Sequence, residues 1–380
     1  MALAPGAAAI TGIGHTEFSK NSGRTELQLA AEAVRAAIAD AGLTPADIDG
    51  LVTFVQDTND ELQLIRSVGI PAIRWTSRTP FGGGGSAATV QHATAAVVSG
   101  AANAVVIYRA FNERSGHRFG QPTGAVTPGM SWHKTYGLDT PAKMYSLWFQ
   151  RYMHQFGLSN EDFGRYAVIA RQHAATNPNA WFYKQPITLD DHQNSRWIVE
   201  PILRLLDCCQ ESDGGVALVI TTTERARDLP QPVVLIEAAT QGDNLNSDVL
   251  FNYYVPDLSR FSEAEYVARQ MYESTGLNPD DIDVALIYEN FSPIVLLQLE
   301  AYGFCGHGEA KDFIAEGNIS LGGKLPVNTH GGLLGEAYIH GVNNIIEGVR
   351  QIRGTAANQV AKVEHALVAA GRSAMILGKG

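Results

Sequence analysis

Residues 42–49 read GLTPADID and residues 276–283 read GLNPDDID, and six of their eight positions match. In each copy the glycine is suited to end a helix, and the proline is suited to open a short helical turn. An apolar run follows each copy, over residues 50–55 and 284–288, as a buried strand would. The repeat therefore predicts two halves that are related by duplication.

The residues before each octapeptide predict a strand and then an amphipathic helix. In the first half, Thr25 and Gln28 have the spacing of a capping box, and apolar residues repeat at helical spacing behind them. The predicted strand and helix cover residues 7–13 and 25–41 in the first half, and residues 233–238 and 262–274 in the second. Each half thus begins as strand, helix, strand.

Each half continues with a glycine-rich turn, a helix and at least one strand. Gly82–Gly85 leads to a predicted helix at 86–99 and a strand at 104–108, whereas Gly331 and Gly332 lead to a helix at 339–353 and strands at 366–370 and 374–377. Strands that alternate with helices predict a mostly parallel sheet that is covered on both faces. The predicted fold class is therefore α/β, and two such units side by side give five layers, α/β/α/β/α.

Residues 111–205 interrupt this alternation and predict a loop-rich insertion in the first half. They hold most of the tryptophans and tyrosines, with helices predicted at 140–156 and 160–177. A long excursion from an α/β core usually carries substrate specificity or an interface. The alternative is that the aromatic residues build a small core of their own. The predicted domains are residues 1–228, which include the insertion, and residues 229–380.

The composition argues against several classes of function. The 380 residues carry a net charge of −11 and no basic stripe interleaved with aromatic residues, so nucleic acid is not expected as a partner. The three cysteines, Cys208, Cys209 and Cys305, include no Cys-x-x-Cys pair, which favours a reducing, cytoplasmic compartment and no metal site in this chain. We find no signal peptide and no apolar run of membrane-spanning length, so no membrane partner is expected.

Three local motifs stand out along the chain: residues 209–217 read CQESDGGVA, residues 288–292 read YENFS, and residues 322–332 read GGKLPVNTHGG. Together they resemble motifs of the thiolase superfamily, in its branch of sterol-carrier-protein-type thiolases and lipid-transfer proteins. The resemblance covers essentially the whole chain. It implies a duplicated five-layer α/β/α/β/α fold with a long insertion in the first half.

The sequence departs from that family where thiolases carry their catalytic groups. A nucleophilic cysteine belongs at the N-terminus of the buried helix, where this chain has Gly82–Gly85 and then Ser86, which we interpret as an N-cap. Tyr338 stands at the histidine of the Gly-His-Pro motif, and Tyr288 stands where the family has Asn or His. The second catalytic cysteine is absent around residues 369–371, and the three cysteines of this chain are interpreted as buried structural thiols.

Two tyrosines at catalytic positions favour a different chemistry. Without a nucleophile no acyl-enzyme forms, but a phenol can hold an oxyanion or pass a proton. Two phenols suit retro-aldol cleavage, with Tyr338 as the base on a β-hydroxyl and Tyr288 as acid or enolate stabiliser, or with these roles reversed. The candidate substrate-binding residues are Asn290, His330, Gly82, Gly83 and His340, although a structural role is the more common one for a histidine such as His340.

The chain is most similar to the thiolase-like aldolases of bacterial steroid side-chain degradation. That resemblance implies cleavage of a 17-hydroxy steroid coenzyme A (CoA) thioester to a 17-keto steroid and propionyl-CoA. It also implies a homodimer that binds a partner subunit with an OB-like fold and a zinc ribbon, giving a heterotetramer. Zinc is expected only in that partner, and no cofactor is expected in this chain.

Two other functions remain open from the sequence. The missing nucleophiles alone are compatible with a non-catalytic protein that binds acyl-CoA or lipid. A divergent acyltransferase with an unrecognised nucleophile is the third possibility, and it requires a covalent acyl adduct. Nucleotide binding is disfavoured, because the glycine run lacks the Gly-Lys-Ser/Thr ending of a P-loop.

Overall fold

The computed structural model describes residues 4–380 except 81, 117, 123–127, 245–252 and 254. In the first half, outside the insertion, the elements are β1 (Ala8–His15), α1 (Glu26–Asp40), β2 (Gly50–Phe54), α2 (Glu61–Val68), β3 (Trp75–Thr79), α3 (Ser86–Val98), β4 (Ala104–Asn112), β7 (Asp213–Thr222) and α8 (Thr223–Ala226). The insertion holds α4 (Pro128–Thr135), α5 (Pro141–Phe156), α6 (Asn160–Thr176), α7 (Leu189–Asn194), β5 (Trp197–Val199) and β6 (Leu203–Arg204). The second half holds β8 (Val234–Gln241), α9 (Ser262–Thr275), β9 (Val284–Ile287), α10 (Pro293–Ala301), α11 (Ala310–Ala315), α12 (Gly332–Gly335), α13 (Val342–Arg353), β10 (His365–Ala369) and β11 (Ser373–Lys379).

The two octapeptides form equivalent turns, and the halves they begin have the same strand order. Each octapeptide contains a short 3₁₀ helix that starts at its proline, Pro45–Asp47 and Pro279–Asp281. The hydrogen-bonded order is β3-β2-β4-β7-β1-β8-β11-β10-β9. When the sheet is read outward from its centre, the strands of the two halves correspond in pairs: β1 with β8, β7 with β11, β4 with β10, and β2 with β9. The predicted duplication is confirmed, and β3 is an additional edge strand of the first half.

The strands are mixed in direction, so the prediction of a mostly parallel sheet is wrong. Only β2–β3, β2–β4 and β9–β10 are parallel, whereas the other five pairs among the described strands of this sheet are antiparallel. The reason lies in the connections. Residues 370–372 join β10 to β11 directly, which is too short for a crossover helix and forces an antiparallel pair.

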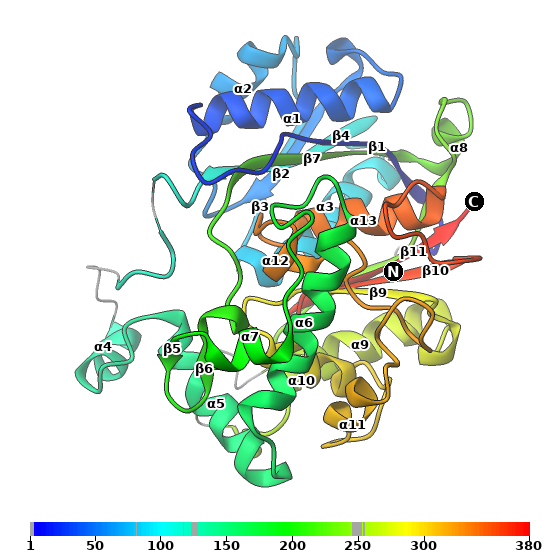
Figure 1. The fold of residues 1–380 in the computed structure, drawn as a ribbon. Helices are drawn as coiled ribbons and strands as arrows, with labels where there is room; N and C mark the ends of the chain where they lie inside the picture. Colours follow the sequence, from blue (N-terminus) through cyan, green and yellow to red (C-terminus); the bar gives the residue numbers. More distant parts are fainter. Residues whose placement is uncertain (1–3, 81, 117, 123–127, 245–252, 254) are drawn as a thin grey trace.

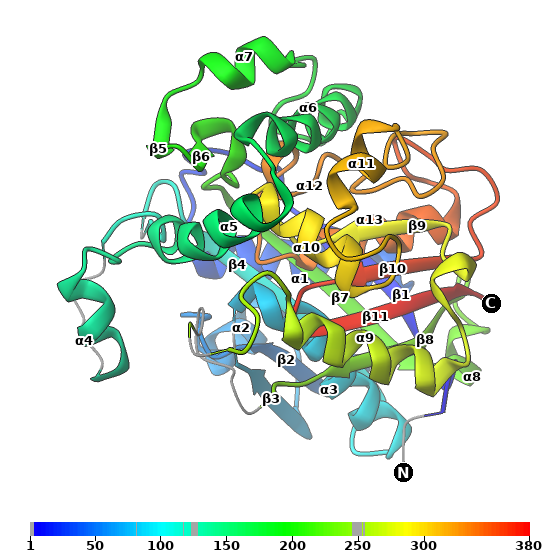
Figure 2. The same ribbon diagram turned by 90° about the horizontal axis from the view of Figure 1, so that it is seen from below.

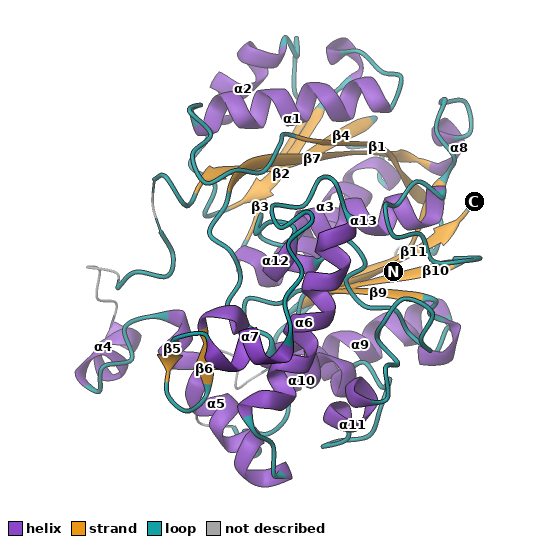
Figure 3. Cartoon of the chain, in the orientation of Figure 1, coloured by secondary structure: helices purple, strands orange, loops and turns teal. Residues whose placement is uncertain are grey.

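Five layers stack as expected (Figure 1, Figure 3). Helices α1 and α2 form the layer at the top of Figure 1, and α9, α10 and α11 lie on the opposite side. Between the strands of the two halves lies a central layer of α3 and α13, each of which packs against strands of both halves. A helix in such a position must bury nearly its whole circumference, and α13 is buried from Val342 to Val349.

The insertion packs its buried aromatic residues against the second half of the chain, in one core cluster that also holds residues of α9, β9 and α10, so the alternative of a small core of their own is wrong. Trp148, Phe149 and Tyr152 on α5 are buried against Phe163 and Tyr166 on α6. The helices predicted at 140–156 and 160–177 are confirmed as α5 and α6. Helix α4 is different, since it stands away from the body in Figure 2. In the described ranges, no helix combines the length and the apolar character that crossing a membrane requires.

The capping box of α1 provides a test of how local sequence contributes to stability. Thr25 Oγ1 accepts a hydrogen bond from Gln28 N at 3.2 Å, and Gln28 Oε1 accepts one from Thr25 N at 2.9 Å. We expect Thr25→Ala to lower the free energy of unfolding by about 1 kcal/mol, because the backbone N–H of Gln28 loses its acceptor. Urea unfolding measures this loss. Thr25→Ser keeps the hydroxyl and should unfold close to the wild type; an equal loss in both variants would contradict the capping role.

Candidate active site

The glycine turn before α3 makes room for an aromatic ring. A Cβ atom at Gly83 would lie 2.2 Å from Cε2 and 2.5 Å from the hydroxyl oxygen of Tyr288. The N-cap of α3 is Gly85, and Ser86 is already the first helical residue, so the predicted N-cap at Ser86 is wrong. The tight 3₁₀ turn of Gly82–Gly85 advances the helix start by one residue. Ser86 Oγ is buried and has no hydrogen-bond partner among the described residues.

The two tyrosines meet directly, as the sequence predicted for a shared site. Tyr288 follows β9, and Tyr338 lies in the loop between α12 and α13, yet their hydroxyl oxygens are 2.9 Å apart. The side chain of Gln298 donates to the carbonyl oxygen of Tyr288, and Ser212 Oγ accepts from the backbone N–H of Tyr338. Both tyrosines are therefore held from the backbone as well as through their hydroxyl groups.

Burial keeps both phenols protonated. The exposed fractions of Tyr288 and Tyr338 are 8% and 7%. Loss of solvation raises the pKa of each phenol well above 10, and the nearby Cys209 and Glu113 raise both pKa values further. A resident phenolate is therefore disfavoured. The pair is suited to passing a proton from one hydroxyl to the next.

The tyrosine pair lies in the wall of a cavity of about 1070 Å³. The cavity opens at the carboxyl ends of parallel strands, since Gln56, Glu113, Tyr288 and Ala370 follow β2, β4, β9 and β10 and all line it. This is the edge of an α/β sheet where ligands generally bind. Six of the seven predicted site residues line the cavity together, as the sequence analysis expected. They are Gly82, Gly83, Tyr288, Asn290, Tyr338 and His340.

His330 is the one predicted site residue that lies outside the cavity wall. Its Nε2 is 3.2 Å from Asn344 Oδ1 on α13, and its ring is fully buried. Burial lowers the pKa of His330 to about 4, so the ring is neutral at pH 7. The turn at Asn328, with φ of +49°, directs this loop into a polar network between α6 and α13. The predicted substrate contact of His330 is therefore not supported by its position.

Several cavity residues were not identified from the sequence. Glu113 directly follows β4, its Oε2 has no hydrogen-bond partner among the described residues, and burial raises its pKa to about 8. Lys20 lies near it, and burial lowers the pKa of its ammonium to about 8. Glu113 could have been found from its place at a strand's carboxyl end. Lys20 lies in a loop without any local signal and reaches the cavity only through folding.

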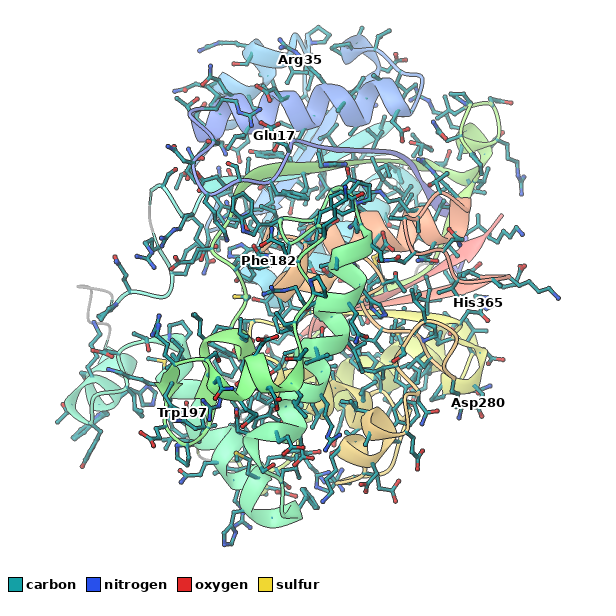
Figure 4. All side chains as sticks on the ribbon, in the orientation of Figure 1. Glu17, Arg35, Phe182, Trp197, Asp280 and His365 are labelled. Carbon is teal, nitrogen blue, oxygen red and sulfur yellow. The ribbon has the colours of Figure 1, made fainter. Side chains whose placement is uncertain are left out.

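The insertion contributes a buried cation to the same cavity. Arg171 on α6 stacks on the ring of Phe182, with 3.4 Å from Cζ to the ring centroid. Figure 4 shows Phe182 beside α6. Among the described residues Arg171 has no carboxylate partner and donates only to the carbonyl oxygen of Gln185, at 3.5 Å, and burial lowers the pKa of its guanidinium to about 10. Such a group is stabilised by an anionic ligand.

Two cysteines also line the cavity, which the interpretation as buried structural thiols did not anticipate. Cys208 and Cys209 are half-buried and stand in the wall near the tyrosines. Burial raises the pKa of both thiols, that of Cys209 well above 9. Since a thiolate is the nucleophilic form, neither cysteine is activated for acyl transfer. Burial likewise raises the pKa of Cys305, to about 12.

Comparisons with known proteins agree with this geometry. A family model described as "Thiolase C-terminal domain-like" matches residues 252–376. A protein of Thermomonospora curvata named steroid side-chain-cleaving aldolase is 57% identical, over 100% of this chain and 99% of that protein. A protein of Mycobacterium tuberculosis named 17-hydroxy-3-oxo-4-pregnene-20-carboxyl-CoA lyase is 56% identical, over 98% of this chain and 99% of that protein. A solved structure described as an Ltp2-ChsH2(DUF35) aldolase is 56% identical and superposes with a TM-score of 0.95, over 100% of this chain and 99% of that chain.

The glycine turn predicts different outcomes for two adjacent substitutions. Gly83→Ala should displace the Tyr288 ring, break the hydrogen bond between the tyrosines and lower the free energy of unfolding by about 1–3 kcal/mol. Gly84→Ala is the matched control, because its Cβ would lie 3.5 Å from the nearest atom, Ala370 O. Urea unfolding and a crystal structure of each variant give the two readouts. An unmoved Tyr288 ring in Gly83→Ala would contradict the steric role of Gly83.

Proposed function

This chain belongs to the thiolase superfamily, in its family of steroid side-chain-cleaving aldolases, and we propose that it cleaves a carbon–carbon bond in a CoA thioester by a retro-aldol reaction. The proposed substrate is a 17-hydroxy steroid with a short side-chain CoA thioester. The products are a 17-keto steroid and propionyl-CoA. The observation that carries this proposal is the hydrogen-bonded tyrosine pair in a cavity whose thiols are not activated.

The proposed reaction needs only a proton transfer and a place for negative charge. The proton leaves the β-hydroxyl group, the bond between the α-carbon and the β-carbon breaks, and its electron pair moves into the thioester as an enolate. The oxygen that lost the proton becomes the keto group. A proton then adds to the α-carbon, so that one proton is released and one is consumed.

The tyrosine pair fits these two proton transfers as a neutral relay. One phenol accepts the hydroxyl proton while its own proton passes across the 2.9 Å hydrogen bond, and the second phenol protonates the α-carbon. No free phenolate is needed, which agrees with the raised pKa of both side chains. We propose Tyr338 as the group nearest the hydroxyl and Tyr288 as the group nearest the enolate; the reversed order uses the same relay.

The cavity has features that suit both parts of such a substrate. Its walls include the aromatic and aliphatic side chains of Phe119, Tyr145, Phe261, Phe291, Ile294 and Leu334, which suit a steroid body. Cationic side chains also line it, and burial lowers the pKa of two of them, Arg171 and Lys20. We propose that the phosphates of CoA approach these cations, because an anion offsets the cost of burying them.

The assembly is a further part of the proposal. The related solved structure carries a name with two components, Ltp2 and ChsH2. We propose that this chain forms a homodimer that binds a second subunit with an OB-like fold and a zinc ribbon. In this assembly zinc belongs to the partner and the chain itself uses no cofactor. Metal analysis of the separated subunits and the mass of the complex in solution test both points.

Tyrosine-to-phenylalanine substitutions test the proposed relay. We expect Tyr288→Phe and Tyr338→Phe each to lower kcat by about 10²–10⁴, because each removes one hydroxyl of the proton path. The measurement is propionyl-CoA release from the 17-hydroxy steroid thioester, by chromatography, with the partner subunit present. Tyr272→Phe is the control, since its hydroxyl donates to Tyr302 O outside the cavity and its loss should leave the rate unchanged.

Three outcomes separate this proposal from the other candidate functions. Full activity in both cavity variants would contradict the relay. Binding of the thioester without any turnover by the wild type would identify a non-catalytic binding protein. A covalent acyl adduct on the wild type, detected by mass spectrometry, would identify an acyltransferase.

A further inference from the structure

A chain of three buried side chains runs from the loop after β2 to the cavity wall. Arg109 Nη1 on β4 pairs with Asp57 Oδ2 at 2.7 Å, and neither side chain is more than 2% exposed. Asp57 Oδ1 is held in turn by the backbone and side-chain nitrogens of Asn59, each at 2.9 Å. The other edge of the guanidinium meets a histidine, because Arg109 Nε donates to His340 Nδ1 at 3.1 Å.

This contact determines which nitrogen of His340 carries a proton. An arginine side chain can only donate, so Nδ1 of His340 must accept. In a neutral imidazole the other nitrogen, Nε2, then bears the hydrogen. Nε2 has no hydrogen-bond partner among the described residues, although the ring itself lines the cavity. His340 thus presents an N–H group on the cavity side, and no described residue accepts a hydrogen bond from it.

The surroundings of His340 hold the ring both in place and neutral. Rings pack on it from β2, from the end of β4 and from its own loop, through Phe54, Phe111 and Tyr338, and Phe119 stacks on it at 5.3 Å between centroids. The charged group that faces it is Arg109, whose own counter-ion is Asp57. Burial and this positive charge lower the pKa of His340 well below 6.5.

The backbone at His340 is also unusual. Its φ of +50° lies in the left-handed region, which is uncommon for a residue with a side chain. Across the cavity wall, Gly82 leaves the ring accessible, because a Cβ atom there would lie 3.4 Å from His340 Cε1. Strain of this kind persists where the surrounding packing imposes it, as it does at many functional sites.

We propose that His340 is a catalytic hydrogen-bond donor that binds the thioester oxygen through Nε2–H and stabilises the enolate, with Arg109 and Asp57 as the residues that fix its tautomer. This inference rests on the proposed retro-aldol reaction and assigns the group that accepts its developing negative charge. The tyrosine pair moves the proton, whereas His340 holds the charge. A neutral donor suits this task because it does not release its proton to the enolate oxygen.

The geometry excludes the more usual role of a histidine at such a site. A general base needs an unprotonated nitrogen facing the substrate, but the only unprotonated nitrogen of His340 is occupied by Arg109. His340 therefore complements the tyrosines and does not duplicate them. The proton from the β-hydroxyl still ends on the α-carbon, and the charge on the thioester oxygen exists only between bond cleavage and that protonation.

Two substitutions of His340 separate the donor from its structural contacts. Asparagine tolerates the left-handed backbone and can keep the bond to Arg109, but its amide is too short to reach the position of Nε2. We expect His340→Asn to lower kcat by about 10²–10³ with little change in KM. His340→Gln places an amide N–H near the position of Nε2 and should recover at least tenfold of that loss. Equal activity of His340→Asn and the wild type would overturn the proposal.

The test of Arg109 and Asp57 as positioning residues must measure a property that a loss of stability alone would not change, such as the pH dependence of activity. We propose the paired variant Arg109→Met with Asp57→Asn, which removes both buried charges together and so avoids an unpaired one. Removing Arg109 takes away one of the two causes that lower the pKa of His340, whereas burial of the ring remains. His340 should therefore begin to protonate at a higher pH than in the wild type, and the acid side of the activity profile should shift to higher pH. An identical pH profile in both proteins would contradict the positioning role.

A spectroscopic measurement tests the tautomer without any activity. Nitrogen-15 correlation spectra of the histidine-labelled protein distinguish Nε2–H from Nδ1–H, and the His340 signals are those that disappear in His340→Asn. We expect Nε2–H in the wild type and a mixture of tautomers in the paired variant. An Nδ1–H form in the wild type would overturn the inference even if the enzyme is active. Absence of turnover with a correct tautomer would instead contradict the proposed function.

Discussion

The site depends on the contact between the backbone of Gly83 and the ring of Tyr288. Any side chain at residue 83 would occupy the space of the phenol, so a nucleophile at that residue and a tyrosine at 288 exclude each other. The glycines of this turn therefore have a structural role of their own, beyond replacing a cysteine. They allow a phenol from the second half to reach the start of α3 and to meet Tyr338, which sets the geometry of every later step in the proposed reaction.

The duplicated architecture brings the interacting groups together. Because α3 and α13 share the central layer, the turn before α3 and the loop before α13 face one another across a few ångströms. The parallel strands of both halves end at the same edge, so Gln56 and Glu113 of the first half line one cavity with Tyr288 of the second. The insertion adds Arg171 and an aromatic wall, which gives the cavity an apolar and a cationic part.

Neutrality is the common property of the two phenols, the histidine and the thiols that meet at the proposed reaction centre. Burial keeps the two phenols protonated, keeps His340 uncharged and raises the pKa of the thiols. In a low-dielectric site, an uncharged relay and an uncharged donor avoid the cost of storing a buried ion between turnovers. Charge appears only on the substrate, at the moment when a fixed N–H group is beside it.

The sequence by itself determined the duplication, the positions of most helices and strands, the absence of a cysteine before α3 and the two tyrosines that replace the usual polar groups. These follow from local periodicity, turn residues and motif spacing, which are readable along the chain. Tertiary structure decided the mixed strand directions, the placing of His330 outside the cavity and the access of Cys209, Glu113 and Lys20 to it. It also decided the role of His340, since the partner that fixes its tautomer is Arg109, a residue 231 positions away in the chain. Contacts of this kind exist only once the two halves have packed together, so no local pattern records them.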